Sequence, residues 1–198
     1  MVAIPSDLDI IMEEPVWSSC RVACYTWGSV NNPVWKILWK LKIPSKVKIF
    51  IWRTLHGIVH LKSILANRHI GTSGSCPICN QGAEDVLHLL FRCLVACEMW
   101  GQLGMLDLIE EATHMDRSGF VVLEDLFRRQ NILLSGFEYV KWNETIAVTC
   151  WYMWWMRRRW THDEDVPPMY RCKMSILSIA SNAAITKKQC TAAGAMWS

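Results

Sequence analysis

Hydrophobic residues recur at intervals of three and four along much of the chain after residue 32, and this spacing predicts helices. In residues 33–41 (PVWKILWKL), Trp35, Leu38 and Trp39 would share one face of a short helix. Residues 44–57 (PSKVKIFIWRTLHG) predict a second helix, which Pro44 can begin and Gly57 can end. Its inward stripe would contain Val47, Phe50, Ile51, Thr54 and Leu55.

Further helices are expected over residues 61–69, from about Glu84 onward, and over residues 120–130, 137–160 and 168–188. Residues 28–33, 71–75 and 104–118 are predicted to be turns or loops, and residues 1–32 show poor periodicity. No segment has the alternation of a strand convincingly. We therefore predict a mainly α protein with about six to eight helices.

Composition is typical of a folded chain, because 52% of the 198 residues are hydrophobic and 20% are charged. The net charge of +3 is distributed unevenly. Residues 15–83 contain nine lysines and arginines but no aspartate or glutamate, so the rest of the chain carries a net charge of −6. This asymmetry predicts that the basic half contacts a polyanion such as nucleic acid.

The sequence indicates an intracellular, reducing environment. The first fourteen residues carry four acids and no basic n-region, so we expect no secretory signal. The longest apolar run, residues 146–156, is far shorter than the roughly 20 residues of a membrane span. Nine cysteines, an odd number, then favour metal ligands and buried thiols over disulfides.

Chemistry is concentrated in residues 76–93 (CPICNQGAEDVLHLLFRC). Cys76 and Cys79 form a C-x2-C pair, and His88 and Cys93 complete a set of three sulfurs and one imidazole. Such a set binds one structural zinc ion and leaves no coordination position for water. Cys20 and Cys24 lack further ligands at a useful spacing and are expected to be buried thiols.

The spacing of His88 and Cys93 raises a geometric problem. Five residues along a regular helix rotate two side chains about 140° apart. The helix must therefore end, distort or tighten near Arg92 for both side chains to reach one ion. Cys97 could replace Cys93, but His88 would then point to the opposite side, so Cys93 is the preferred ligand.

Residues 33–101 resemble the zinc-binding domain that follows the reverse transcriptase of plant non-LTR retrotransposons. The resemblance rests on the order and spacing of aromatic, basic and metal-binding residues, namely Trp35, Trp39, Pro44, Lys46, Lys48, Phe50, Trp52, Arg53, Leu61, Leu65, Arg68, Cys76, Cys79, Glu84, His88, Leu89, Phe91, Cys93 and Trp100. Residues 151–168 also resemble the connector that precedes a ribonuclease H domain in such elements. We accordingly expect an irregular segment (1–32), a zinc-stapled helical domain (33–101) and a helical connector region (102–198).

The resemblance does not extend to catalysis. No paired aspartates of a polymerase are present, and no spaced acidic set for two-metal ribonuclease H chemistry follows. We therefore expect a non-catalytic zinc module with no small-molecule substrate. Two roles fit it: contact with DNA or RNA through the basic half, or docking onto a protein partner without binding nucleic acid.

Phosphate contacts are predicted from Lys42, Lys46, Lys48 and Arg53. Trp35, Trp39 and Trp100 lie at apolar-stripe positions and are predicted to build the core around the zinc, rather than to stack on bases. The tryptophans of residues 151–160 are expected to form a packed or partner-facing surface.

Overall fold

The computed structural model describes residues 32–67, 69, 74–115, 117–129 and 142–194. The predicted segment 1–32 lies almost wholly outside these residues. The described part is helical, with one isolated antiparallel bridge between Ser75 and Ala83. The mainly α prediction is confirmed.

The first helices of the described chain are α2 (Pro33–Lys40), α3 (Ser45–Leu55) and α4 (Lys62–Asn67). Asn32 caps α2 by accepting a hydrogen bond from the backbone N–H of Val34 at 3.1 Å. Gly57, at φ +65°, follows the end of α3 as predicted, in a conformation that favours glycine. On α3, Val47, Phe50, Ile51 and Thr54 are buried as predicted, and Leu55 is partly buried against the core.

A π-helix, η2 (His88–Arg92), leads into α5 (Leu94–Gln102), α6 (Leu106–Thr113) and α7 (Gly119–Arg128). The prediction of a loop over residues 104–118 is wrong for α6. That short helix buries only Ile109 and Ala112, too few apolar positions to give a clear period in the sequence.

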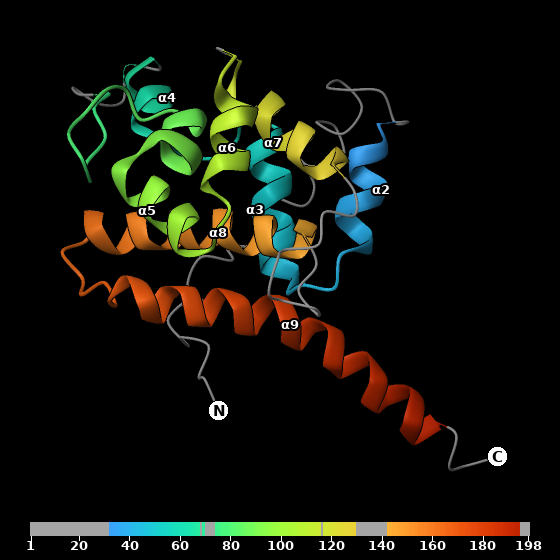
Figure 1. The fold of residues 1–198 in the computed structure, drawn as a ribbon. Coiled ribbons are helices and arrows are strands. Elements are labelled where there is room, and N and C mark those ends of the chain that lie inside the picture. Colours follow the sequence, from blue (N-terminus) through green and yellow to red (C-terminus); the bar gives the residue numbers. More distant parts are fainter. Residues whose placement is uncertain (1–31, 68, 70–73, 116, 130–141, 195–198) are drawn as a thin grey trace.

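The last two elements are the long helices α8 (Trp142–Thr161) and α9 (Met169–Gly194), which run side by side (Figure 1). α8 lies between α9 on one side and α3, α7 and η2 on the other. A helix that packs on several faces needs apolar residues around most of its circumference, which explains its hydrophobic sequence. α9 continues beyond the other helices at its C-terminal end (Figure 1).

One cluster of buried side chains includes residues from α2 at one end of the sequence to α9 at the other. Trp100 is fully buried in it, and its indole N–H donates to the carbonyl oxygen of Leu90 at 2.8 Å. The core prediction is therefore confirmed for Trp100. Trp35 is only partly buried against the cluster. The division of the chain near residue 101 stays a prediction.

The core prediction is wrong for Trp39, whose side chain is 52% exposed. α2 turns Val34 and Leu38 into the core instead. Trp39 lies about 100° further around the helix than Leu38 and therefore points away from the packed face. The sequence pattern could not separate these two faces, because both carry apolar residues.

Candidate metal centre

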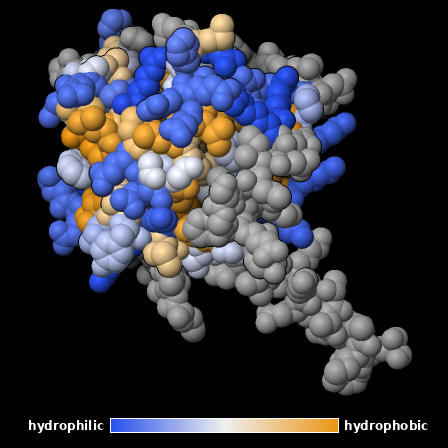
Figure 2. Space-filling view, viewed as in Figure 1, coloured by the Kyte–Doolittle hydropathy of each residue, from blue (hydrophilic) through white to orange (hydrophobic). Residues whose placement is uncertain are grey.

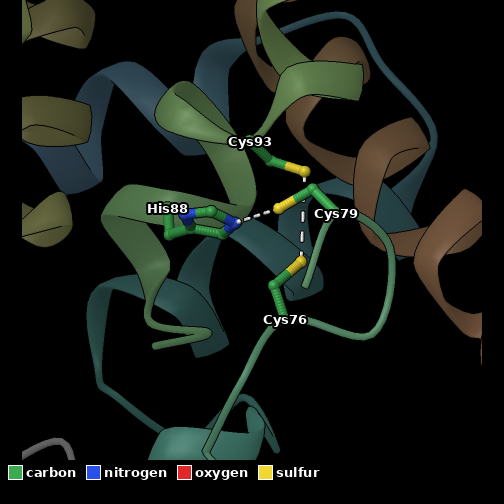
Figure 3. A group of neighbouring side chains, drawn as sticks. All are labelled: Cys76, Cys79, His88 and Cys93. Carbon is green, nitrogen blue, oxygen red and sulfur yellow. Dashed lines mark hydrogen bonds between the residues drawn. The ribbon is translucent and has the colours of Figure 1, made fainter. Parts of the chain in front are cut away.

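The first half of the candidate site is a tight turn that contains Cys76 and Cys79. The backbone N–H of Asn80 donates to the carbonyl oxygen of Cys76 at 3.0 Å, and that of Cys76 donates to Gly82 at 3.1 Å. Asn80 and Gly82 have φ values of +54° and +71°, conformations that these two residue types tolerate best. The turn directs both sulfur atoms toward the same point (Figure 3).

The second half begins at Asp85, whose carboxylate accepts a hydrogen bond from the backbone N–H of His88 at 2.7 Å. This is an N-cap interaction, and it lies one residue beyond the predicted helix start at Glu84. Val86, Leu87, Leu90 and Phe91 are buried, as their periodicity predicted.

The helix then widens. The backbone N–H of Cys93 donates to the carbonyl oxygen of His88 at 2.7 Å, a bond between residues five positions apart that defines a π-turn. The backbone becomes extended at Cys93, and α5 starts at Leu94. The expected distortion near Arg92 is confirmed, and its form is a widening rather than a tightening. It lets His88 and Cys93 face the same point.

The four predicted ligands converge (Figure 3). Their ligand atoms lie within 4.8 Å of one another. Sγ of Cys76 and Sγ of Cys93 are 4.0 Å apart, and Sγ of Cys79 is 3.2 Å from Nε2 of His88. Around a tetrahedral zinc ion with Zn–S bonds of about 2.3 Å, two sulfurs lie about 3.8 Å apart. The donor set and its spacing therefore fit zinc.

Cys97 is not part of this group. Its thiol points to the carbonyl oxygen of Phe91 at 3.4 Å. Of the two alternatives at this end of the site, the geometry thus favours Cys93. Cys20 and Cys24 lie outside the described residues.

Burial favours the uncharged form of every ligand, so it shifts the pKa values of the thiols and of the imidazole in opposite directions. It raises the pKa of the Cys93 thiol to about 12 and also raises that of Cys76. It raises the pKa of Cys79 as well, but hydrogen bonds from Gln81, Cys76 and Cys93 outweigh it and leave that pKa lowered. Burial lowers the pKa of His88 against the raising effect of Asp85 and Glu84, which favours the neutral imidazole that a metal requires.

Two buried groups connect the site to the rest of the fold. Glu84 is fully buried and accepts a backbone hydrogen bond from Lys62 at 2.8 Å as well as two from Arg157 of α8. Gly119, the first residue of α7, lies against the backbone of Val86 and Leu87. Sequence reasoning did not identify Arg157 or Gly119, since neither has a signal of its own within the local pattern.

The four residues predicted to contact phosphate do not lie on one surface. Lys46 and Arg53 are seven positions apart on one side of α3, and Lys48 is on the opposite side. The ammonium of Lys46 lies 5.3 Å from the ring centroid of Trp151 on α8. Lys42 is exposed, and Lys48 donates to the carbonyl oxygen of Trp39 at 3.0 Å.

Within the described residues, no helix is long and apolar enough to cross a membrane. No solved structure shows a significant match to the chain. A protein of Arabidopsis thaliana named "Putative ribonuclease H protein" is 28% identical over 117 residues, which cover 59% of this chain. The chain covers 18% of that relative's length.

Residues 14–100 match the family described as zinc-binding in reverse transcriptase. The match contains all four converging side chains and all of the residues named above for the resemblance. The geometry of a zinc site and the family match agree, so residues 14–100 are similar to the zinc-binding domain of reverse transcriptases in both sequence and candidate ligand set.

Proposed function

We propose that the chain is a non-catalytic module in which Cys76, Cys79, His88 and Cys93 hold one structural zinc ion. The convergence of these ligand atoms within 4.8 Å carries the proposal. Zinc bound there would hold the C-x2-C turn against the π-turn. Four protein ligands fill a tetrahedral site, whereas a catalytic zinc keeps a position for water or substrate.

The zinc content of the purified chain tests this assignment. We expect one zinc per chain, and much less in Cys76→Ser and His88→Ala. Cys97→Ser is the matched control, because Cys97 is a neighbouring thiol outside the converging group. If either ligand variant had the zinc content of the wild type, or if Cys97→Ser lost zinc, the ligand assignment would be contradicted.

We further propose that the basic half of the module contacts nucleic acid. Support comes from the stretch of nine cations without an acid, and from the names of the matched family and of the Arabidopsis relative. Lys42 is the strongest of the four candidates, because it is exposed, whereas Lys46 already contacts Trp151 and Lys48 already donates to the carbonyl oxygen of Trp39. Arg53 remains a candidate on the opposite side of α3.

A salt titration of binding to single-stranded and duplex oligonucleotides tests this second part. Binding through phosphates weakens steeply as salt rises, because counterions are released on association. We expect Lys42→Gln to weaken binding and to reduce the salt dependence by about one ion. Absence of any binding at low salt would exclude the nucleic-acid role.

The competing function is docking onto a protein partner. Exposed apolar side chains near the α8–α9 connection, among them Trp160, Tyr170 and Met174, favour it. Retention of a protein partner at high salt, together with no oligonucleotide binding at low salt, would select this function. Magnesium-dependent cleavage of an RNA–DNA hybrid by the purified chain would instead contradict the non-catalytic assignment.

A further inference from the structure

The exposed indole of Trp39 is surrounded by positive charge. Lys36 and Lys40 are on the same helix and are exposed, and Lys48 of α3 donates to the backbone carbonyl of Trp39 at 3.0 Å. Figure 2 shows hydrophilic residues at the edge of the molecule where α2 lies. The Trp39 side chain is 52% exposed, and it lies among these cations.

Three more aromatic rings extend the basic surface around Trp39 from α2 to α3. Trp35 lies one turn before Trp39, and its ring centroid is 4.9 Å from that of His56. The His56 ring is in turn 4.5 Å from that of Trp52, and its Nδ1–H donates to the carbonyl oxygen of Trp52 at 2.9 Å. All three are partly buried, so their contacts hold them in place while leaving part of each ring accessible.

The acidic side chains near this surface already accept hydrogen bonds from within the fold. Glu124 of α7 approaches the start of α2, where it accepts hydrogen bonds from Asn32 and Arg128. Glu144 of α8 is buried, and its carboxylate accepts from the backbone N–H of Lys42 at 3.4 Å. α2 and α3 themselves carry no acid. The surface is therefore complementary to an anion.

We propose that these residues form a binding site for single-stranded nucleic acid, which we call the aromatic strip: Trp35, Trp39, Trp52 and His56, with Lys36, Lys40 and Lys48. The inference rests on the proposed nucleic-acid role and specifies its ligand. Unpaired bases offer an open π-face to the Trp39 indole, while the lysines contact the phosphates. Stacked base pairs inside a duplex offer no such face.

The test compares two exposed tryptophans in the full zinc-loaded chain. Trp39 is 52% exposed and Trp160, on α8, is 47% exposed, so Trp160→Ala is a matched control for Trp39→Ala. Binding of labelled oligo-dT, oligo-rU and a mixed-sequence duplex is measured by fluorescence anisotropy. Circular dichroism and zinc content establish that both variants are folded.

We expect Trp39→Ala to raise the Kd for the single strands by about 5-fold to 150-fold, which is the effect of losing one stacked base. The Kd for the duplex should change less than about twofold, and Trp160→Ala should have little effect on any of the three ligands. A difference between oligo-dT and oligo-rU would show whether DNA or RNA is preferred. Trp39→Phe should recover part of the lost affinity.

Three outcomes would overturn the aromatic strip. If the wild-type chain binds oligonucleotides but Trp39→Ala has no larger effect than Trp160→Ala, the strip is wrong and the proposed phosphate contacts survive. The same holds if Trp39→Ala weakens single strands and duplex equally. If the wild-type chain binds none of the three ligands at low salt, the nucleic-acid role fails as a whole, and the strip fails with it.

Discussion

Arg157 of α8 donates two hydrogen bonds to the carboxylate of Glu84, at 2.6 and 2.7 Å, although the two residues are 73 positions apart. The carboxylate is fully buried, and the arginine side chain is only 13% exposed. The pair connects the segment that carries the four candidate ligands to α8, in which most side chains are buried. The geometry of the candidate site is thereby tied to residues outside the family match.

Replacing one member of this pair should destabilise the fold strongly. Arg157→Met leaves the Glu84 carboxylate buried without its charged partner, and such a loss costs about 3–5 kcal/mol. Urea denaturation of the zinc-loaded chain measures the change. The double variant Glu84→Met, Arg157→Met should recover much of the loss, because it leaves no unpaired charge.

Arg128→Met is the control for this prediction. Arg128 pairs with Glu124 at 2.5 Å, but their side chains are 50% and 30% exposed. Pairs of this kind contribute about 0–1 kcal/mol. Similar losses from Arg157→Met and Arg128→Met would contradict a special role for the buried pair.

Gly119 should not tolerate a side chain. An added Cβ would lie 2.7 Å from the carbonyl carbon of Val86 and 2.8 Å from Cα of Leu87, and backbone atoms cannot move aside cheaply. We expect Gly119→Ala to destabilise the fold by about 1–3 kcal/mol, or more if α7 must shift. Thermal unfolding followed by circular dichroism measures the effect.

Gly101→Ala is the matched substitution within a helix. A Cβ there would be 3.9 Å from the Leu106 side chain, which is ordinary contact. Alanine should stabilise α5 by about 0.5–1 kcal/mol at this position. If both alanine variants melt at the same temperature, the close approach of α7 to residues 86–87 is wrong.

The sequence predicted the local elements well where a strong period or a special residue is present. The stripe on α3, the cap at Gly57 and the convergence of the four ligands all follow from spacing within short segments. The face of α2 did not follow, since Trp35 and Trp39 are as apolar as Val34 and Leu38. Val34 and Leu38 are buried in the common core, and α2 packs against α7, a tertiary contact that the sequence does not show.

Long-range pairing was also beyond a single sequence. Nothing near Glu84 indicates that its partner is Arg157 rather than one of the two following arginines. The five-residue spacing of His88 and Cys93 does not fit a regular helix, so the sequence predicted that the helix must be distorted there. It did not predict that the distortion is a π-turn. Within the π-turn, the carbonyl oxygen of Leu90 accepts from the indole N–H of Trp100, a contact that the local spacing does not indicate.

Zinc removal should weaken the cooperativity of unfolding. The side chains of Cys76 and Cys93 are part of the common core, so loosening the site also loosens the packing of η2 against α5 and α8. We expect EDTA to lower and broaden the thermal transition of the helical circular dichroism signal, because zinc binding energy at such sites is folding energy. His88→Ala should melt like the chelated wild type and be insensitive to EDTA. Equal transitions with and without EDTA in a chain shown to contain zinc would contradict the prediction.

Zinc binding should also release protons, with an affinity that rises with pH. In the zinc-free fold, burial keeps the Cys76 and Cys93 thiols protonated at pH 7, since the pKa of Cys93 is raised to about 12 and that of Cys76 is raised as well. Both must bind as thiolates, so each gives up a proton, whereas the lowered pKa of His88 means that the imidazole is already neutral. Acidification therefore opposes binding and weakens zinc affinity, and alkaline conditions strengthen it.

Calorimetric titrations at pH 7 in two buffers of different ionisation enthalpy count the protons released, and we expect at least two per zinc. A binding enthalpy independent of the buffer would mean that no thiol loses a proton, and the thiolate ligand set would then be wrong.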